Sequence, residues 1–383
     1  MELAFDLPTY HERVQRARTA MRERGLDALV VTLPDSIHWL SGFDTIGYLW
    51  PQTLLIDHSD PEPVLHTRTT EGPGVRATSW LSAPVLYDIA TEDPMEVLAR
   101  SISERGLGGG RLGIELRAFT LLPAHVEALR RLLPDASWVD TTDLIAELRL
   151  IKTPAELGYQ RQAAQIADHA MRATLQALRP GISETELAGI AALALGQAGS
   201  EFAAIPPMVV SGPRSALVHA MASRRTLAIG DVVCVEIGAA VHRYHAIVMR
   251  TATLGKPTAR VRQVAECLRE ALLAAIAAAR PGAPAHEPDD AANAVLERLD
   301  LVRRRCHRIG YSLGIAYPPG WLEPMMLVAG DPHTLAPGMS FSLEPNLSLQ
   351  DEGFGMKLGE TLVCTEEGAE RLSELDLDLF VAP

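Results

Sequence analysis

The pattern of expected helices and strands changes once along this chain, near residues 147–157, and that change limits the possible folds more than any other feature. Before it, short apolar runs such as 26–32 and 111–115 alternate with amphipathic helical patterns such as 10–25. Strands that alternate with helices are typical of layered α/β structures. The first part, residues 1–150, is therefore expected to form an α/β domain.

Longer helical patterns and β-rich runs follow this boundary, so a second domain is expected over residues 155–383. Helices are expected at 155–178, 181–199, 258–280 and 286–299. Strands are expected at 206–212, 231–241, 243–255, 341–349 and 356–365. Ser183 and Glu186 form a capping-box pattern at the start of the second helix. This order predicts an α+β domain, with an antiparallel sheet and helices inserted in pairs.

Composition narrows the class of protein. A formal charge of −13 argues against binding to nucleic acid or to an anionic membrane surface. No run approaches the roughly 20 apolar residues of a spanning helix, and MELAFDLPTY has neither the basic flank nor the apolar run of a signal peptide. The four cysteines form no CxxC pair, so we expect buried free thiols in a reducing cytoplasm.

Five polar residues of the second half stand out as candidates for chemistry: His219, Glu236, Tyr311, Glu344 and Glu360. Glu236 lies in the apolar run VVCVEIGA, and Glu344 is flanked by Leu343 and Pro345. A lone buried acid is costly unless it is paired or has a function. We therefore expect Glu236 and Glu344 to be functional, whereas Glu360 has a possible ion-pair partner in Lys357.

The motifs around these residues, SGPRSALVHA, VEIGAAV, GYSLG, SLEPN and KLGET, resemble those of the creatinase/prolidase/methionine aminopeptidase superfamily, peptidase family M24. The motifs occur in the family's order, and the resemblance spans the chain. It implies an α/β creatinase-type N-terminal domain plus an α+β "pita-bread" C-terminal catalytic domain. It also implies a homodimer, in which the partner's N-terminal domain closes the active site.

Metallopeptidases that this chain resembles bind two metal ions through two Asp, one His and two Glu. By position, these ligands fall on Glu236, Ile247, Tyr311, Glu344 and Gly359, with Glu360 beside the last. Only two of the five positions keep a carboxylate, and metal sites need roughly four to six suitable ligands. We therefore expect no metal and no other cofactor.

Two carboxylates that face each other without a metal repel, and at least one of them would take up a proton. A planar amidinium or guanidinium would relieve this repulsion, because its forked donors match carboxylates well. Metal-free branches of the superfamily act on such compounds: creatinase hydrolyses a C–N bond of creatine, and ectoine hydrolase opens a cyclic amidine. The chain resembles the second branch at RYH, which ends in His245, at GYS-G followed by YPP-W, and at SGFDTIGYLWPQ.

The resemblance implies that Glu236 contacts or attacks the substrate carbon and that His219 transfers the proton. Glu344 would anchor a cation, and Tyr311 and Glu360 would assist. The expected substrate-binding residues are His245, Tyr317, Trp321, Glu323, Trp50 and Tyr48. Several of these candidates, and His307, could instead have no role in binding or catalysis. His245, His307 and Tyr311 suit a structural role, and Tyr48 and Trp50 suit a core position.

The leading hypothesis is a metal-independent hydrolase of a C–N bond in a small amidine, guanidine or amide compound. Its ligand would be a small cationic or zwitterionic nitrogen compound. Three alternatives remain open: a metal-dependent Xaa-Pro dipeptidase or aminopeptidase, a C–N lyase or ring-forming biosynthetic enzyme, and a non-catalytic binder of a small zwitterion. Chelator-sensitive cleavage of proline dipeptides would distinguish the first alternative, and binding without turnover would distinguish the last.

Overall fold

The computed structural model describes residues 3–383, which form two compact units divided between Arg149 and Leu150. The first unit is built on one mixed sheet with the strand order β4-β3-β2-β1-β5-β6. Its strands are β1 (Ala28–Val31), β2 (Thr53–Asp57), β3 (Val64–Arg68), β4 (Val85–Tyr87), β5 (Arg111–Ile114) and β6 (Ser137–Asp140). β1, β5 and β6 are parallel, whereas β2 runs antiparallel to both of its neighbours.

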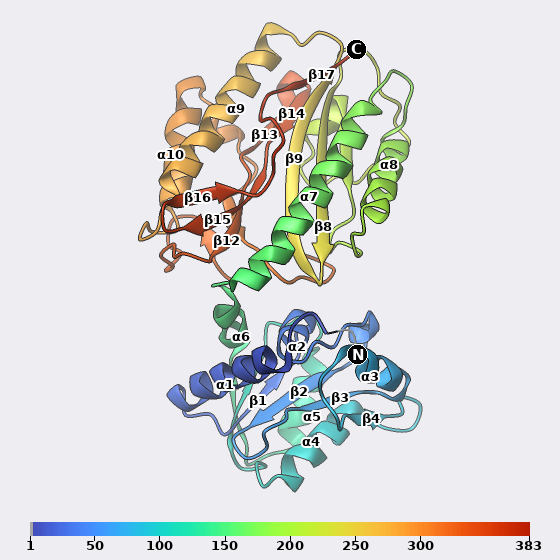
Figure 1. Ribbon diagram of the computed structural model, residues 1–383, viewed down its shortest axis with the longest axis vertical. Coiled ribbons are helices and arrows are strands. Elements are labelled where there is room, and N and C mark those ends of the chain that lie inside the picture. Colours follow the sequence, from blue (N-terminus) through green and yellow to red (C-terminus); the bar gives the residue numbers. More distant parts are fainter. Residues whose placement is uncertain (1–2) are drawn as a thin grey trace. The chain divides into compact units, whose positions relative to one another are not determined.

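Six helices accompany this sheet (Figure 1): α1 (Leu7–Glu23), α2 (Pro34–Ser41), α3 (Gly72–Thr78), α4 (Pro94–Glu104), α5 (Pro123–Leu132) and α6 (Thr142–Arg149). Asp6 caps α1 and Asp93 caps α4, each through a side-chain oxygen that accepts a backbone N–H of the first turn. Strands and helices thus alternate as the sequence pattern predicts.

The second unit contains three sheets. A four-stranded sheet pairs the long strands β8 (Val232–Val241) and β9 (Tyr244–Leu254) as an antiparallel hairpin, with β7 (Met208–Ser211) and β17 (Phe380–Ala382) at the edges. A five-stranded sheet contains β10 (Gly310–Ser312), β11 (Met326–Leu327), β12 (Ser340–Leu343), β15 (Glu360–Thr365) and β16 (Gly368–Arg371). The third sheet is the antiparallel pair β13 (Asn346–Leu349) and β14 (Phe354–Lys357).

Two pairs of helices cover these sheets. α7 (Pro154–Gln176) lies across β8 and β9, with α8 (Glu184–Gln197) beside it, and α9 (Ala259–Ala278) packs on α10 (Glu287–Leu296) (Figure 1). Capping boxes start the first two: Thr153 with Glu156 at α7, and Ser183 with Glu186 at α8. The expected pairing of helices and the expected capping box at Ser183 are both confirmed.

Two segments expected as single strands are each broken into two. Residues 341–349 divide between β12 and β13 at Glu344 and Pro345, and residues 356–365 divide between β14 and β15 at Leu358 and Gly359. Proline has no N–H for a strand ladder, so a continuous strand is disfavoured at Pro345. The first break takes the chain from the five-stranded sheet to the two-stranded one, and the second returns it to the five-stranded sheet. Glu344 lies at the first break.

All four cysteines are free, and Cys234, Cys267 and Cys364 are buried, whereas Cys306 is partly exposed. Among residues 3–383, no helix is long and apolar enough to cross a bilayer.

Candidate active site

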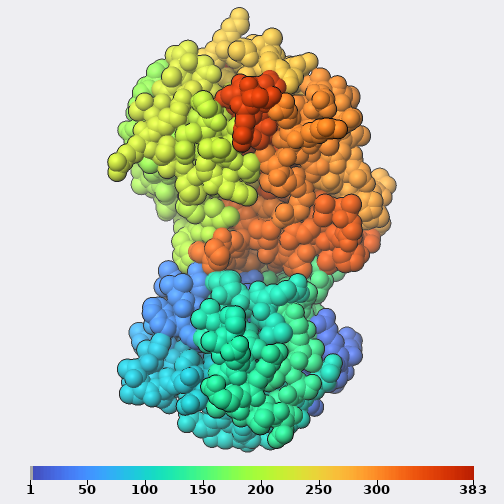
Figure 2. Space-filling model, turned by 180° about the vertical axis from the view of Figure 1, so that it is seen from behind, coloured from blue at the N-terminus to red at the C-terminus, as the bar shows by residue number. Residues whose placement is uncertain are grey.

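The second unit contains a cavity of about 610 Å³ that is lined by four of the five candidates for chemistry, all except Glu360. Polar side chains on its wall are His219, Glu236, His307, Arg308, Tyr311, Trp321, Glu344, Asn346 and Lys357. Apolar residues, among them Ala204, Ile205, Met208 and Met249, complete the lining. Two stretches of chain that supply much of the wall, near residues 204–221 and 307–322, lie side by side on one face of this unit, yellow-green and orange in Figure 2.

The β8–β9 hairpin positions Glu236 on this wall. Glu236 pairs with Met249 and Gly238 pairs with Ile247 across the hairpin. Gly238 is required by close packing, because a Cβ there would lie 2.6 Å from Trp321 Cζ3. The indole of Trp321 therefore lies directly on the strand, two residues from Glu236.

Lys357 neutralises Glu236. Its Nζ lies 2.7 Å from Glu236 Oε2 and donates a second hydrogen bond, 2.6 Å long, to the Val218 carbonyl oxygen. Both side chains are nearly buried, with exposed fractions of 4% and 7%. The prediction of a cleft with uncompensated negative charge is therefore wrong for Glu236, since a buried cation already pairs with it.

Glu344 is the second acid of the cavity. Its Oε2 accepts hydrogen bonds from Tyr311 at 3.1 Å and from Ser342 at 3.0 Å. Burial, and then the nearby charge of Glu236, raise the pKa of Glu344 to about 8. At neutral pH Glu344 is thus mostly protonated, in agreement with the expectation that one of the two acids takes up a proton.

Tyr311 is held between two polar partners. Trp321 Nε1 donates to its hydroxyl at 2.8 Å, and the hydroxyl in turn donates to Glu344. Burial raises the pKa of Tyr311 well above its usual range, so the phenol stays protonated and acts as a donor.

His219 and His307 face each other across the cavity with nearly parallel rings, whose centroids are 6.4 Å apart. His219 is exposed and lies on the loop after the 3-10 turn η3 (Gly212–Ala216). His307 Nδ1 donates to the Arg308 carbonyl oxygen at 2.7 Å, and its Nε2 accepts from Asn346 Nδ2 at 3.2 Å. Its Nε2 also lies 3.8 Å from Glu344 Oε1. Burial lowers the pKa of His307, so this imidazole is neutral.

The structure does not bring Glu360 to the cavity. Its side chain is fully buried between Arg250 and Arg371, with Arg371 Nε 3.1 Å from Glu360 Oε2 and Arg250 Nη2 2.5 Å from Glu360 Oε1. The suggested pairing of Glu360 with Lys357 is also wrong, because Lys357 pairs with Glu236. Glu360 is part of a structural ion cluster and does not assist at the cavity wall.

His245, Tyr317 and Glu323 lie behind the wall. His245 Nδ1 donates to the Arg243 carbonyl oxygen at 2.8 Å, and its Nε2 accepts from the Ala204 N–H at 2.9 Å. Burial, and then Arg243, lower the pKa of His245 to about 3. The Tyr317 ring contacts the Arg243 guanidinium, and Glu323 forms a buried ion pair with Lys152. These three predicted substrate-binding residues are structural, and only Trp321 of that group lines the cavity.

Tyr48 and Trp50 belong to the first unit. Tyr48 is buried against the edge of Phe119, whereas Trp50 is 41% exposed and stacks under the Arg68 guanidinium at 3.9 Å.

The positions that would complete a dinuclear metal site are filled by apolar packing. Ile247, Met249 and Tyr311 belong to one hydrophobic cluster. A Cβ on Gly359 would lie 2.9 Å from the Met249 side chain, so a carboxylate at 359 has no room. Among residues 3–383, no three His, Cys, Asp or Glu side chains are grouped so that they could hold a metal ion. The donor set therefore does not fit a metal centre of the family's type.

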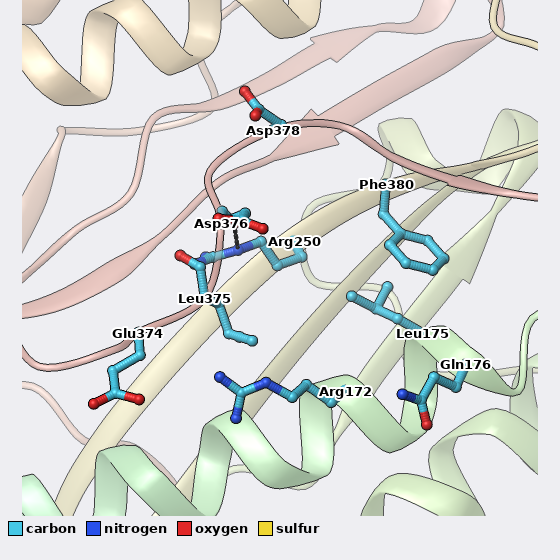
Figure 3. A pocket seen from close by; sticks show the side chains of 9 residues that line it. All are labelled: Arg172, Leu175, Gln176, Arg250, Glu374, Leu375, Asp376, Asp378 and Phe380. Carbon is cyan, nitrogen blue, oxygen red and sulfur yellow. Dashed lines mark hydrogen bonds between the residues drawn. The ribbon is translucent and has the colours of Figure 1, made fainter.

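A second cavity of about 220 Å³ lies between α7 and the segment that leads into β17 (Figure 3). Figure 3 shows Arg250 on the wall of this cavity, where its Nε donates a hydrogen bond to the Asp376 carbonyl oxygen, 2.7 Å away. The remaining Arg250 donors go to Met249, Gly359, Glu360 and Leu375. Arg250 thus joins the C-terminal segment to β9 and is not available to a ligand.

Three polar residues that line the cavity were not assigned to the site from the sequence: Lys357, Arg308 and Asn346. Lys357 could have been recognised from the sequence, since it is a lone lysine in the otherwise apolar strand β14. The sequence analysis paired it with Glu360, whereas its partner is Glu236. Asn346 lies directly opposite Lys357 in the β13–β14 pair. This register exists only because the chain breaks after Glu344, and that break was not foreseen.

Comparison with known proteins agrees with this architecture. Residues 159–366 match metallopeptidase family M24, and residues 13–151 match the creatinase/prolidase N-terminal domain. The chain is 30% identical to an ectoine hydrolase from Halomonas elongata, over 100% of this chain and 99% of that protein. It is 27% identical to an Xaa-Pro dipeptidase from Pyrococcus furiosus, over 96% and 99%. A prolidase structure from Thermococcus sibiricus superposes with a TM-score of 0.89 at 25% identity, covering 97% of this chain and 99% of that one.

Fold and cavity together define a two-domain pita-bread hydrolase. The chain belongs to metallopeptidase family M24 and carries that family's creatinase/prolidase N-terminal domain.

Proposed function

We propose that this protein is a metal-independent hydrolase of a C–N bond in a small amidine, guanidine or amide compound. The observation that carries the proposal is the Glu236–Lys357 ion pair, because Glu236 occupies a metal-ligand position of the family's metallopeptidases and here has a lysine ammonium as its cationic partner. Apolar packing of Met249 against Gly359 and the similarity to an ectoine hydrolase support it further.

In this proposal the substrate's cationic nitrogen group lies against Glu344. Binding of a cation favours the ionised carboxylate, so Glu344 releases its proton to solvent as the substrate binds. Tyr311 and Ser342 hold the carboxylate in place through their hydroxyl groups. Trp321 and Met249 shield the reacting carbon from bulk water.

The His219 imidazole then takes a proton from a water molecule as its oxygen attacks the amidine carbon. The resulting tetrahedral intermediate collapses when His219 returns the proton to the departing nitrogen. One C–N bond breaks, the remaining hydroxyl proton passes to the released amine, and an amidinium substrate yields an amide and an ammonium ion. Glu236, held by Lys357, acts as an electrostatic anchor for the positive charge of the bound amidinium and of the departing nitrogen once it is protonated.

A substrate panel tests the proposal. Pure protein is incubated with ectoine, creatine, guanidino acids and proline dipeptides, with and without a chelator, and its metal content is measured. We expect cleavage of an amidine or guanidine that a chelator leaves unchanged. Cleavage of proline dipeptides alone, lost with the chelator, would overturn the proposal.

The second candidate is an Xaa-Pro dipeptidase, which the similarity to the Pyrococcus furiosus enzyme favours. It requires metal ligands that the cavity wall lacks, since Ile247 and Gly359 carry no donor side chain. The same panel separates the two candidates.

A further inference from the structure

Two buried polar atoms on the cavity wall have no partner. Within residues 3–383, several buried side-chain nitrogen and oxygen atoms lack a hydrogen bond, but only Arg308 Nε and Asn346 Oδ1 belong to residues that line this cavity. One is a donor and the other is an acceptor. A buried polar atom without a partner costs about 1–3 kcal/mol, so both atoms are suited to meet a ligand.

The Arg308 guanidinium is not used by the protein. In the described part of the chain it forms no ion pair and no side-chain hydrogen bond. Its central carbon lies 5.2 Å from the centroid of the Tyr311 ring, and burial, together with this guanidinium charge, lowers the pKa of His307. The buried arginines Arg250 and Arg243 differ: Arg250 donates to five oxygens, and Arg243 donates to the Ala316 and Phe202 carbonyls.

The Asn346 side-chain amide is oriented by a hydrogen bond from its nitrogen, and its oxygen accepts no hydrogen bond from residues 3–383. His307 Nδ1 donates to a carbonyl, so Nε2 is unprotonated and accepts from Asn346 Nδ2. The Asn346 nitrogen is thereby committed to His307 and, at 3.7 Å, to Met249 Sδ. Its oxygen remains as an acceptor for an N–H group.

The charges on the wall complete this picture. Lys357 is taken by Glu236 and the Val218 carbonyl oxygen, which leaves Arg308 as the cation and Glu344 as the acid that a ligand can meet. Tyr311 touches both, through its ring and its hydroxyl respectively. One small molecule can therefore reach both groups.

We infer that Arg308 binds a carboxylate of the substrate, while Glu344 and Asn346 Oδ1 bind its cationic nitrogen group. This inference rests on the proposed function and narrows its substrate class to zwitterions: an amidinium or guanidinium joined to a carboxylate by a short apolar skeleton. In the complex every charge on the wall has a partner, which is the condition for burying charges at low cost.

Pairs of probes test the inference by titration calorimetry, which needs no turnover. One member of each pair carries the carboxylate, such as ectoine or guanidinoacetate, and the other is the same amidine or guanidine without it. Arg308→Met should weaken binding of the carboxylate probes by about 10- to 100-fold, the usual loss for a charge-assisted hydrogen bond. It should leave binding of the carboxylate-free probes within about threefold, well under one such bond. Asn346→Leu should weaken both members of a pair.

Arg304→Met is the matched control, because Arg304 is on the same segment but pairs with Asp351 outside the cavity. Melting temperatures verify that each variant folds. Equal weakening of both probes by Arg308→Met, no weakening of either, or failure of every carboxylate probe to bind the natural protein would each overturn the inference. Probes that bind through Arg308 but are never cleaved would instead overturn the proposed function and leave the inference standing.

Discussion

At the scale of single residues, the Glu236–Lys357 pair determines the chemistry of the cavity. Two charges leave water together here, so their mutual attraction must offset a large desolvation cost. Removing only the cation would leave Glu236 buried without a partner, whereas removing both charges would not.

Lys357→Met is therefore expected to lower the free energy of unfolding by about 3–5 kcal/mol, as for other broken buried pairs. The double variant Glu236→Gln with Lys357→Met should regain half of that loss or more. Urea unfolding of the two single variants and the double variant gives the coupling free energy. Additive effects of the two substitutions would contradict a direct interaction.

His219 should act in the reaction without holding the fold together. Because it is exposed on a loop, His219→Ala should leave the melting temperature unchanged. It should lower kcat by about 10²–10⁴-fold, the usual contribution of a histidine acid/base. His169→Ala, on the exposed face of α7, is the control and should retain full activity. Near-normal kcat in His219→Ala would remove this residue from the mechanism.

At the scale of elements, the β8–β9 hairpin and the Trp321 segment fit together only because residue 238 is a glycine. Gly238→Ala would place a methyl group 2.6 Å from Trp321 Cζ3 and push the indole away from the Tyr311 hydroxyl. We expect a loss of about 1–3 kcal/mol, typical of overpacking, together with reduced activity.

Gly189→Ala is the matched control for this substitution. Gly189 lies in α8 with open space around its Cα, so an added Cβ meets nothing. Alanine should stabilise the helix there by up to about 1 kcal/mol. Thermal unfolding and a steady-state assay of the two variants measure the contrast. If Gly238→Ala and Gly189→Ala changed the free energy of unfolding equally, the Trp321 side chain would have to move aside at little cost, which would contradict this prediction.

The elements themselves were largely predictable, because periodicity reports burial and most elements here bury one face. The helices at 155–178 and 258–280 appear as α7 and α9 within a few residues. The breaks at Glu344 and Gly359 were not predictable from periodicity, since apolar residues flank both of them. They depend on which of two sheets each half of the segment joins, which is a tertiary choice.

The same distinction holds for the site. Glu236, Glu344, Tyr311, His219 and Trp321 were found through motifs and all line the cavity. Glu360 and Glu323 are equally buried acids, and only the structure shows that arginine and lysine side chains already neutralise them. Sequence order does not reveal such partners, because they are supplied by distant segments.

At the scale of the whole molecule, each unit holds a buried acid with a raised pKa. Glu344 titrates near pH 8 beside Glu236, Tyr311, Ser342, Lys357 and His307. In the first unit, burial raises the pKa of Glu115 to about 7, although it accepts the N–H groups of Thr32 and Leu33.

Both acids bind a proton more tightly in the folded protein than in the unfolded chain, where their pKa is about 4.5. The stability that these two acids contribute therefore falls as pH rises between about pH 4.5 and pH 8. Buried His245, whose pKa is lowered to about 3, contributes in the opposite direction below about pH 6.5. Glu344→Gln should remove the contribution of Glu344 to the decrease in the free energy of unfolding with pH, and the contribution of Glu115 should remain. Calorimetric unfolding at about pH 5 and about pH 8 measures the effect. An unchanged slope in the variant would contradict the raised pKa of Glu344.

The contact between Met249 and Gly359 bears on how this chain can change over evolutionary time. A glutamate at 359 would collide with Met249, and a smaller residue at 249 would open a void while 359 stays glycine. Each single substitution toward the ligand set of the family's metallopeptidases is thus expected to be harmful until its neighbour has also changed, and Ile247 and Tyr311 would have to change as well. Such sign epistasis means that this ligand set could be built here only by coordinated substitutions on β9, on β10 and between β14 and β15.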